Sequence, residues 1–413
     1  MSVKVRVLFV LYLLILLCLP RPNFLGPAYY RLVDLILVLF PIIIFSVLIT
    51  ANRSLSIGFT QASRNLIFLL LLYFAWQIIV ITVISIFNRT VLADFIQLYK
   101  PLLYITATLL GMISVKYMNS DYLIRILTFI HIINIIVCIF QMAEVDIFYY
   151  LFTARPKEIV DIHYLREGSQ SRVIGTITNP NMFGIYQATM GLFYLRLLIL
   201  SRKMKYLVLF ITTIVLLLFS QSRTAFLIFG MLLVVGLLSE LRRFKINLKV
   251  ILGIIIIGLL STFLAFKTDF LHYLASGLIK IAEGDALVQH SLMLRLDHWG
   301  MVIDEIKNNI LVGHGPGFGN LNIEYIDNNY LFILYRFGIV GLFLYLFIVY
   351  YIIRKTRNSN LLIKYFVLYF WIVLLISSVL MESLESMKLT PLVFFTSGFL
   401  VQTKTSDGVT NAE

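Results

Sequence analysis

Polar residues that could do chemistry gather in short stretches of an otherwise apolar chain. In the stretch SRVIGTITNPNM, Arg172 precedes Asn179 and Asn181, and in the stretch SQSR, Ser222 precedes Arg223. A guanidinium is planar and presents several N–H donors in a fixed geometry, so it suits phosphate oxygens. Arginines delivered from separate segments to one surface could therefore hold a diphosphate.

Two further stretches add a possible proton acceptor. LRLDHW contains Arg295 and His298, and the glycine-rich GHGPGFGN, with His314, comes shortly before DNNYL, with Asp327 and Asn328. A carboxylate at the entry of a helix is stabilised by the helix dipole and can accept a proton from a hydroxyl group. These stretches predict a site that combines anion binding with general-base chemistry.

Each stretch also has a plain structural explanation. Asn179 followed by proline is typical of a helix start, and Asp327 or Asn328 could cap the helix that follows. Arg223 could snorkel at a membrane interface, and Arg295 could lie on the solvated flank of a helix. The glycines of GHGPGFGN alternate and follow no predicted strand, so a tight turn is favoured over a nucleotide-binding loop.

The composition indicates an all-α polytopic membrane protein. Of the 413 residues, 60% are hydrophobic and only 13% are charged. The two cysteines lie in apolar runs and predict neither a disulfide nor a metal site. The net charge of +13 is scattered between apolar runs and forms no patch for nucleic acid. We expect about twelve transmembrane helices, near residues 5–20, 32–50, 66–87, 95–116, 122–143, 182–200, 204–220, 223–240, 248–266, 329–353, 361–381 and 389–402, of which the last is the weakest.

The distribution of lysine and arginine predicts the topology. These residues favour alternate short connections, which places both termini in the cytoplasm. The chain then divides into helices 1–5 (1–143), a long extracytoplasmic loop (144–181), helices 6–9 (182–266), a second long extracytoplasmic loop (267–328), and helices 10–12 with a cytoplasmic tail (329–413).

The second long loop carries amphipathic patterns. One apolar stripe runs from Leu292 to Ile310 at helical spacing and includes Trp299, and another covers residues 271–281. We expect both helices to lie on the membrane surface or to cap the bundle, over a site that opens to the outside.

The motifs, taken in order, resemble those of the O-antigen ligase and polymerase superfamily of bacterial polysaccharide assembly. The resemblance spans about residues 170–345. It rests on an arginine before NPN, an SR pair at a helix junction, an arginine near Trp299, a GHGPGF turn, and DNNYL followed by GIVG. Ligases of this family are similar to one another in carrying histidine where this chain has Asp327. An Asp–Asn pair looks more like the polymerases.

The resemblance implies a membrane glycosyltransferase of the GT-C type, inverting, metal-independent and without a cofactor, in the bacterial cytoplasmic (inner) membrane. Its donor and acceptor would be glycans linked to undecaprenyl diphosphate, and its product O-antigen, capsule or exopolysaccharide. Asp327, Arg223 and Arg295 would be catalytic. Substrate binding would fall to Arg172, Asn179, Asn181, Ser222, His298, His314 and Asn328. The lipid bilayer, a chain-length regulator and a flippase would be further partners, and nucleic acid would not.

Other functions remain open. A ligase of the same family would share the architecture. A flippase or transporter for lipid-linked sugars would instead depend on charges inside the membrane, for which Lys100 and Asp34 are the candidates. A pure scaffold would need none of these residues.

Overall fold

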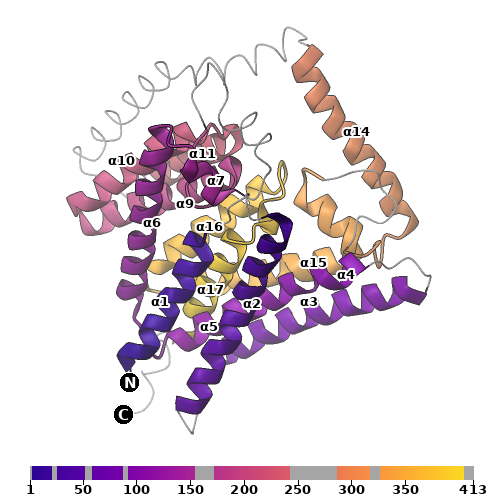
Figure 1. Ribbon diagram of the computed structural model, residues 1–413, viewed down its shortest axis with the longest axis horizontal. Coiled ribbons are helices and arrows are strands. Elements are labelled where there is room, and N and C mark those ends of the chain that lie inside the picture. Colours follow the sequence, from indigo (N-terminus) through magenta and orange to yellow (C-terminus); the bar gives the residue numbers. More distant parts are fainter. Residues whose placement is uncertain are drawn as a thin grey trace.

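The computed structural model describes residues 2–20, 26–51, 58–86, 92–153, 172–241, 286–316 and 326–403, and this part of the chain forms helices joined by short turns (Figure 1). The helices are α1 (Ser2–Cys18), α2 (Gly26–Ala51), α3 (Gln61–Ile86), α4 (Leu92–Gln97), α5 (Tyr99–Ser114), α6 (Ser120–Met142), α7 (Ile147–Phe152), α9 (Pro180–Ser201), α10 (Met204–Phe219), α11 (Arg223–Leu241), α14 (Ala286–Asn308), α15 (Asn329–Arg357), α16 (Ile363–Ser377), the 3₁₀ turn η2 (Ser383–Glu385) and α17 (Leu389–Gln402).

The helices agree with a multi-pass membrane protein. Among the described residues, five helical segments are long and apolar enough to cross a bilayer, and shorter apolar helices occur at the other expected positions. The expected span at 248–266 and the expected amphipathic helix at 271–281 lie outside the described residues. The run expected at 95–116 is divided by a turn at Leu98 into α4 and α5.

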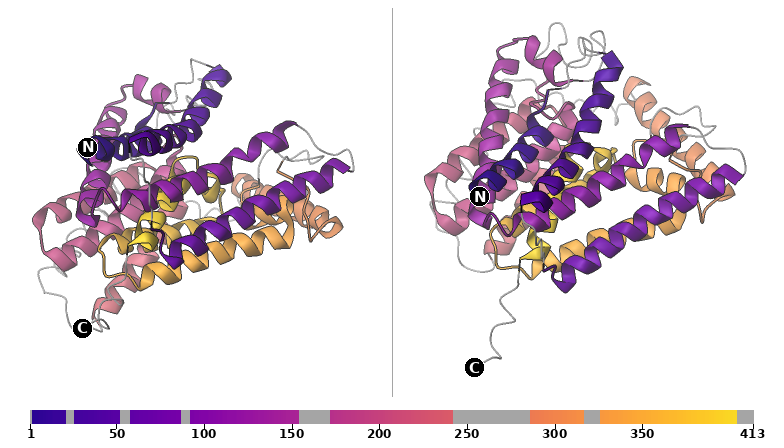
Figure 2. Two further views of the ribbon diagram at one scale, coloured as in Figure 1. Left: turned by 90° about the horizontal axis from the view of Figure 1, so that it is seen from below. Right: turned by 60° about the horizontal axis from the view of Figure 1, so that its bottom comes forward.

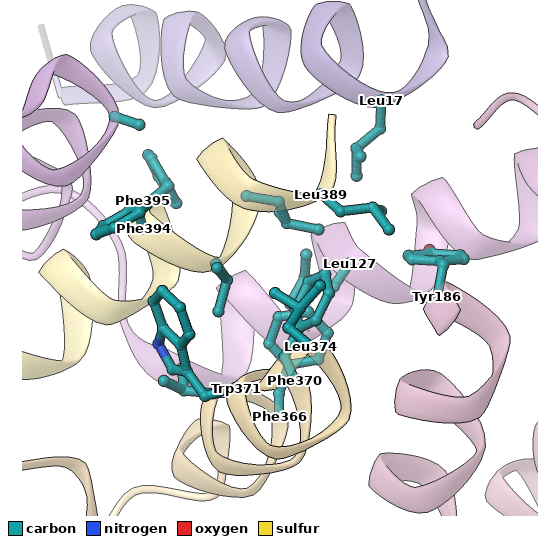
Figure 3. Close-up of a cluster of buried hydrophobic side chains, with 14 of the residues drawn as sticks. Leu17, Leu127, Tyr186, Phe366, Phe370, Trp371, Leu374, Leu389, Phe394 and Phe395 are labelled. Carbon is teal, nitrogen blue, oxygen red and sulfur yellow. The ribbon is translucent and has the colours of Figure 1, made fainter. Parts of the chain in front are cut away.

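The core lies where α16 and α17 pack against α1, α6 and α9. Figure 3 shows Trp371 and Phe366 of α16 with Phe394 of α17, and Leu17 and Tyr186 lie at the edge of the same cluster. The Trp371 and Phe394 rings pack edge to face, with 5.3 Å between their centroids. Burial of this aromatic surface from lipid and water fixes the helices relative to one another.

The weakest expected span, 389–402, is the most enclosed helix of the bundle. Every residue of α17 from Leu389 to Val401 is buried. A Cβ atom at Gly111 of α5 would overlap the Phe395 carbonyl, and one at Gly398 would overlap that of Thr108. Small residues at helix contacts let membrane helices approach closely, so glycine here serves packing.

Helix α15 is broken at Gly338, where φ is 65° and ψ is −175°. This conformation is essentially confined to glycine. Figure 2 shows α15 running alongside α3 over most of its length, and Trp76 of α3 donates a hydrogen bond of 2.8 Å to the Phe337 carbonyl at the break. A non-helical backbone segment at this depth needs such partners, because lipid offers none.

The turn that precedes α15 in the chain supplies hydrogen-bond partners for the backbone groups that the break in α15 leaves unpaired within the helix. The His314 amide donates to Tyr335 O at 2.8 Å, and the Gly315 amide donates to Arg336 O at 2.9 Å. Beyond the break, the Ile339 amide donates to Ile310 O at 2.8 Å. The glycine-rich stretch therefore pairs with a discontinuous helix.

Two glycines of this turn, Gly313 and Gly315, adopt backbone conformations that favour glycine, whereas Gly317 and Gly319 lie outside the described residues. Gly313 has a φ of 83° and Gly315 has a φ of 91°, both in the left-handed region that favours glycine. A Cβ atom at Gly313 would lie 2.5 Å from the Gly338 amide nitrogen. The turn and the break in α15 thus meet backbone to backbone.

The helix expected on residues 292–310 forms as α14, and its apolar stripe is divided between a buried and an exposed part. α14 forms and Ile306 is buried, but Leu296, Ile303 and Ile310 of the stripe are 43–48% exposed. The side of α14 that packs on α15 instead carries Val302 and Ile306, which lie in a cluster with Ile326, Phe332 and Tyr335. α14 therefore packs on α15 through Val302 and Ile306, and its exposed apolar side chains remain available to lipid.

Candidate active site

Arg172 joins the first two predicted stretches. Its Nε donates to Ser220 O at 3.2 Å, one Nη donates to the Asn181 side-chain oxygen at 3.1 Å, and the same Nη reaches Gln221 O at 3.5 Å. A single guanidinium therefore links the NPN stretch at the start of α9 to the α10–α11 turn. We call Arg172, Asn181 and residues 220–223 the arginine junction.

Two buried polar side chains of α6 hold the segment that carries Arg172. The Gln141 side-chain oxygen accepts from the Gly175 amide at 2.9 Å, and the Asn134 oxygen accepts from the amide and hydroxyl of Thr176 at 3.0 and 2.9 Å. Both α6 side chains are fully buried. Sequence reasoning missed them because one polar residue in an apolar helix has no pattern of its own.

Lys388 anchors the same segment from the connection between α16 and α17. Only 3% of this residue is exposed, and its ammonium donates to Thr176 O at 2.5 Å. It also donates to Leu17 O and Leu19 O at 3.3 and 3.2 Å, at the end of α1. A cation at a helix C-terminus offsets the negative end of the helix dipole, so Lys388 ties the end of α1 to the segment that carries Arg172.

Asn179, beside the junction, and Ser222 and Arg223, within it, lie at helix starts. Asn179 caps α9, since its side-chain oxygen accepts from the amides of Asn181 and Met182 at 2.8 and 3.3 Å. Ser222 is buried, and a Cβ atom at Gly184 would lie 2.7 Å from its Cβ. Arg223, partly exposed, is the first residue of α11, where the helix dipole adds to its positive charge.

A second group forms where α15 begins. The Arg295 Nε donates to Asp327 Oδ2 at 3.0 Å, and the two side chains are 46% and 27% exposed. Asn328 is the cap of α15, with its side-chain oxygen accepting from the amides of Tyr330 and Leu331 at 2.9 and 3.1 Å. Asp327 is therefore one residue outside the cap and pairs with an arginine from a different helix.

Glu382 lies close to this pair. Its carboxylate accepts a hydrogen bond of 2.9 Å from the Ile326 amide, next to Asp327. Burial raises the pKa of Glu382 to about 7, and the negative charges of Glu385 and Asp327 add to this rise, while the Ile326 hydrogen bond and Arg336 oppose it. A carboxyl group that exchanges its proton near neutral pH is a feature of acid–base sites. No spacing pattern along the chain points to Glu382.

Glu385 joins Lys100 and Arg336 in an ionic network beside Glu382. Its carboxylate pairs with the Lys100 ammonium and lies 3.8 Å from the Arg336 guanidinium, which stacks on the Phe332 ring at 3.6 Å. Burial opposes ionisation of Glu385, but the two cations outweigh it and lower its pKa. Lys100 was one of the two candidates for a transport charge, with Asp34, and it pairs with Glu385 in the connection between α16 and α17. The side chain of Asp34 lies outside the described part of the chain. We call Arg295, Asp327, Glu382, Glu385, Arg336 and Lys100 the carboxylate cluster.

The two histidines differ in their surroundings. His314 stacks on the Tyr335 ring at 4.8 Å, and its Nε2 lies 2.9 Å from Glu305 O, so its ring supports the turn against α15. His298 is partly exposed on α14, three residues after Arg295. That either histidine binds substrate stays a prediction.

The α16–α17 connection, residues 378–388, links the arginine junction to the carboxylate cluster. Lys388 reaches Thr176 on one side, Glu382 reaches Ile326 on the other, and Ser378 O accepts from the Asn329 amide at 2.8 Å. Within the described ranges, no three His, Cys, Asp or Glu side chains gather as a metal site. At one end of the bundle, the arrangement combines guanidiniums that can bind an anion with carboxylates that can accept a proton.

Comparison with known families agrees with the motifs. Residues 208–346 match the family described as O-antigen ligase, and this match confirms the resemblance to the O-antigen ligase and polymerase superfamily. The matched part contains Arg223, Arg295 and Asp327, the three residues predicted to be catalytic. No curated protein matches the chain.

Proposed function

We propose that the protein is a polysaccharide polymerase that joins lipid-linked repeat units on the outer face of the bacterial cytoplasmic membrane. The observation that carries the proposal is the ion pair of Arg295 with Asp327 at the entry of α15, within the part of the chain that matches the O-antigen ligase family. This pair places an anion-binding group and a proton acceptor in contact.

The donor would be a growing glycan on undecaprenyl diphosphate. Arg295 and Arg223 bind the diphosphate and stabilise the negative charge that develops on it as it leaves, which is commonly the largest contribution to this type of catalysis. Arg172 holds the α9 and α10–α11 segments in place through Ser220 and Asn181, and its charge adds to the field at the arginine junction.

The acceptor would be a hydroxyl group on the next lipid-linked repeat unit. Its oxygen attacks the anomeric carbon of the donor, a new glycosidic bond forms, and the bond to the diphosphate breaks with inversion. The hydroxyl proton passes to the Asp327 carboxylate. Because Arg295 holds Asp327 before substrate arrives, a diphosphate that draws Arg295 to its own oxygens would release the carboxylate at the moment it is needed.

The architecture supports this reaction on the extracytoplasmic side. Both clusters lie in or beside the segments that the positive-inside bias places outside. We propose a GT-C-type, metal-independent enzyme that acts with a flippase, which supplies the repeat units, and with a chain-length regulator.

Replacement of Asp327 tests the proposed base. Asp327→Asn keeps the shape of the side chain but cannot take the proton, so we expect loss of long polymer at an unchanged membrane level of the protein. Asp304→Asn is the matched control, because Asp304 is an exposed acid on α14 that pairs only with its neighbour Lys307 among the contacts described. Full polymer length with Asp327→Asn would refute the assignment of the base.

A ligase is the second candidate, because the matched family is described by that activity. The two reactions leave different products when the gene is deleted. Loss of a polymerase leaves single repeat units on the cell surface, whereas loss of a ligase leaves finished polymer on its lipid carrier.

A further inference from the structure

A cavity lies at the end of the bundle opposite the two clusters. Its walls come from the start of α1, the α5–α6 connection, the α15–α16 connection and the last turn of α17, and its volume is about 660 Å³. Along α6, the first residue, Ser120, lines this cavity, while Gln141 contacts the arginine junction segment 21 residues later. At 1.5 Å per residue, the two places are about 30 Å apart, roughly the thickness of a bilayer core.

Positive charge dominates the wall of the cavity. Arg6, Lys116 and Arg125 line it, and none of the described residues that line it is acidic. Asp121, the acidic residue of the first turn of α6, is exposed and is not part of the wall. The same end of the bundle carries the lysines and arginines that the positive-inside bias assigns to the cytoplasm.

The guanidiniums are held in place by backbone contacts. The Arg6 Nε donates to the Tyr117 carbonyl, which joins the start of α1 to the α5–α6 connection. The Arg125 Nε donates to Asp121 O at 3.4 Å, and the guanidinium lies 5.9 Å from the centre of the Tyr122 ring. Positioned guanidiniums lose less freedom when they bind an anion than mobile side chains do.

A buried hydroxyl group without a partner lies in the same wall. Ser120 is 9% exposed, and its side-chain oxygen has no hydrogen-bond partner among the described residues. It is the first residue of α6, whose N-terminus, capped by Asn119, carries the positive end of the helix dipole. Buried hydroxyl groups ordinarily have a hydrogen-bond partner, and a ligand in this cavity could supply one to Ser120.

We propose that this cavity binds a phosphate group, carried either by an anionic phospholipid or by a free phosphorylated compound of the cytoplasm. Arg6, Lys116 and Arg125 supply the charge, and the Ser120 hydroxyl donates to a phosphate oxygen. The apolar part of the wall, with Met118 and Phe399, suits the non-phosphate portion of the ligand. The site is separate from the proposed reaction and does not depend on it.

Titration of the purified full-length protein tests the site. Short-chain phosphatidylglycerol represents the lipid source and inorganic phosphate the free source, with sodium chloride at equal ionic strength as the blank. Binding of either probe to the wild type, measured by calorimetry, supports the site and identifies the source. Binding of neither probe overturns the proposal.

Two variants link binding to the cavity. Lys116→Gln and Arg125→Gln together should weaken binding by about fivefold for each charge removed, because each basic residue near a phosphate surface contributes to that extent. Lys355→Gln is the matched control, since Lys355 is exposed at the same end of the bundle but does not line the cavity. Equal affinity in the double variant and the wild type, or an equal loss in the control, would overturn the assignment.

Ser120→Ala separates binding from folding. Its hydroxyl has no protein partner to lose, so the Tm without ligand should stay the same while affinity for the bound probe falls about tenfold. Unchanged affinity would show that the hydroxyl does not face the ligand.

Discussion

The pairing of the glycine-rich turn with the break in α15 predicts a large effect of Gly338→Ala. Gly338 has a φ of 65° and a ψ of −175°, a conformation that costs a non-glycine residue about 1–3 kcal/mol. The added Cβ would also overlap the Leu311 carbonyl. The turn has to move away for the methyl group to fit.

That movement removes the three backbone hydrogen bonds that join the turn to α15, from the amides of His314, Gly315 and Ile339. At a net value of about 1 kcal/mol each, their loss adds about 3 kcal/mol to the strain. We therefore expect destabilisation of at least about 4 kcal/mol, together with loss of polymer, because the turn and the start of α15 flank the Arg295–Asp327 pair.

Gly230→Ala is the matched control, because a Cβ at Gly230 in α11 would meet nothing within 4 Å and alanine favours a helix by up to about 1 kcal/mol. Thermal unfolding of both variants in the same detergent, with polymer length measured in cells, gives the comparison. If Gly338→Ala unfolds at the same temperature as Gly230→Ala and supports normal polymer, the turn does not hold the break as described.

Three further predictions concern the charged residues. Since the pKa of Glu382 is raised to about 7 and its ordinary value is 4.5, the stability that its neutral form contributes is complete below about pH 4.5 and is lost as pH rises through 7. Tm of the wild type should fall across this window more than Tm of Glu382→Gln, and parallel curves would contradict this. Arg172→Lys should reduce polymer about tenfold or more, because lysine cannot bridge Ser220 and Asn181 as the guanidinium does; normal polymer at equal protein level would argue against the junction. Glu385→Gln should cost about 3 kcal/mol by leaving Lys100 and Arg336 without their anion, whereas Lys307→Gln should cost less than about 0.5 kcal/mol in denaturant titrations.

Local patterns in the sequence were sufficient to predict most helices and the residues that begin them. Asn179, which precedes a proline, caps α9 and Asn328 caps α15, because capping depends on neighbours within three residues. The motifs also singled out Arg172, Arg295 and Asp327, but they predicted neither the contact of Arg172 with the α10–α11 turn nor the pairing of Arg295 with Asp327.

Residues that depend on tertiary contacts were harder to predict. Asn134 bonds the Thr176 amide 42 positions away, Gln141 the Gly175 amide 34 positions away, and Lys388 the Leu17 carbonyl 371 positions away. A single sequence holds no record of such partners. Glu382 gains its raised pKa from burial, which follows from the packing of the α16–α17 connection. The spacing on α14 identified its apolar stripe, but it could not show which side of the helix α15 covers, because that depends on the neighbouring helix.

The length distribution of surface polysaccharide in a deletion strain is the most direct test of the central claim. The strain would be complemented with the wild type, with Arg223→Ala, or with Arg357→Ala, an exposed arginine at the end of α15 as control. We predict that the wild type and Arg357→Ala restore long chains, while Arg223→Ala leaves single repeat units on the surface. Absence of any repeat unit from the surface of the deletion strain would contradict the polymerase assignment, because the protein would then move lipid-linked sugars across the membrane.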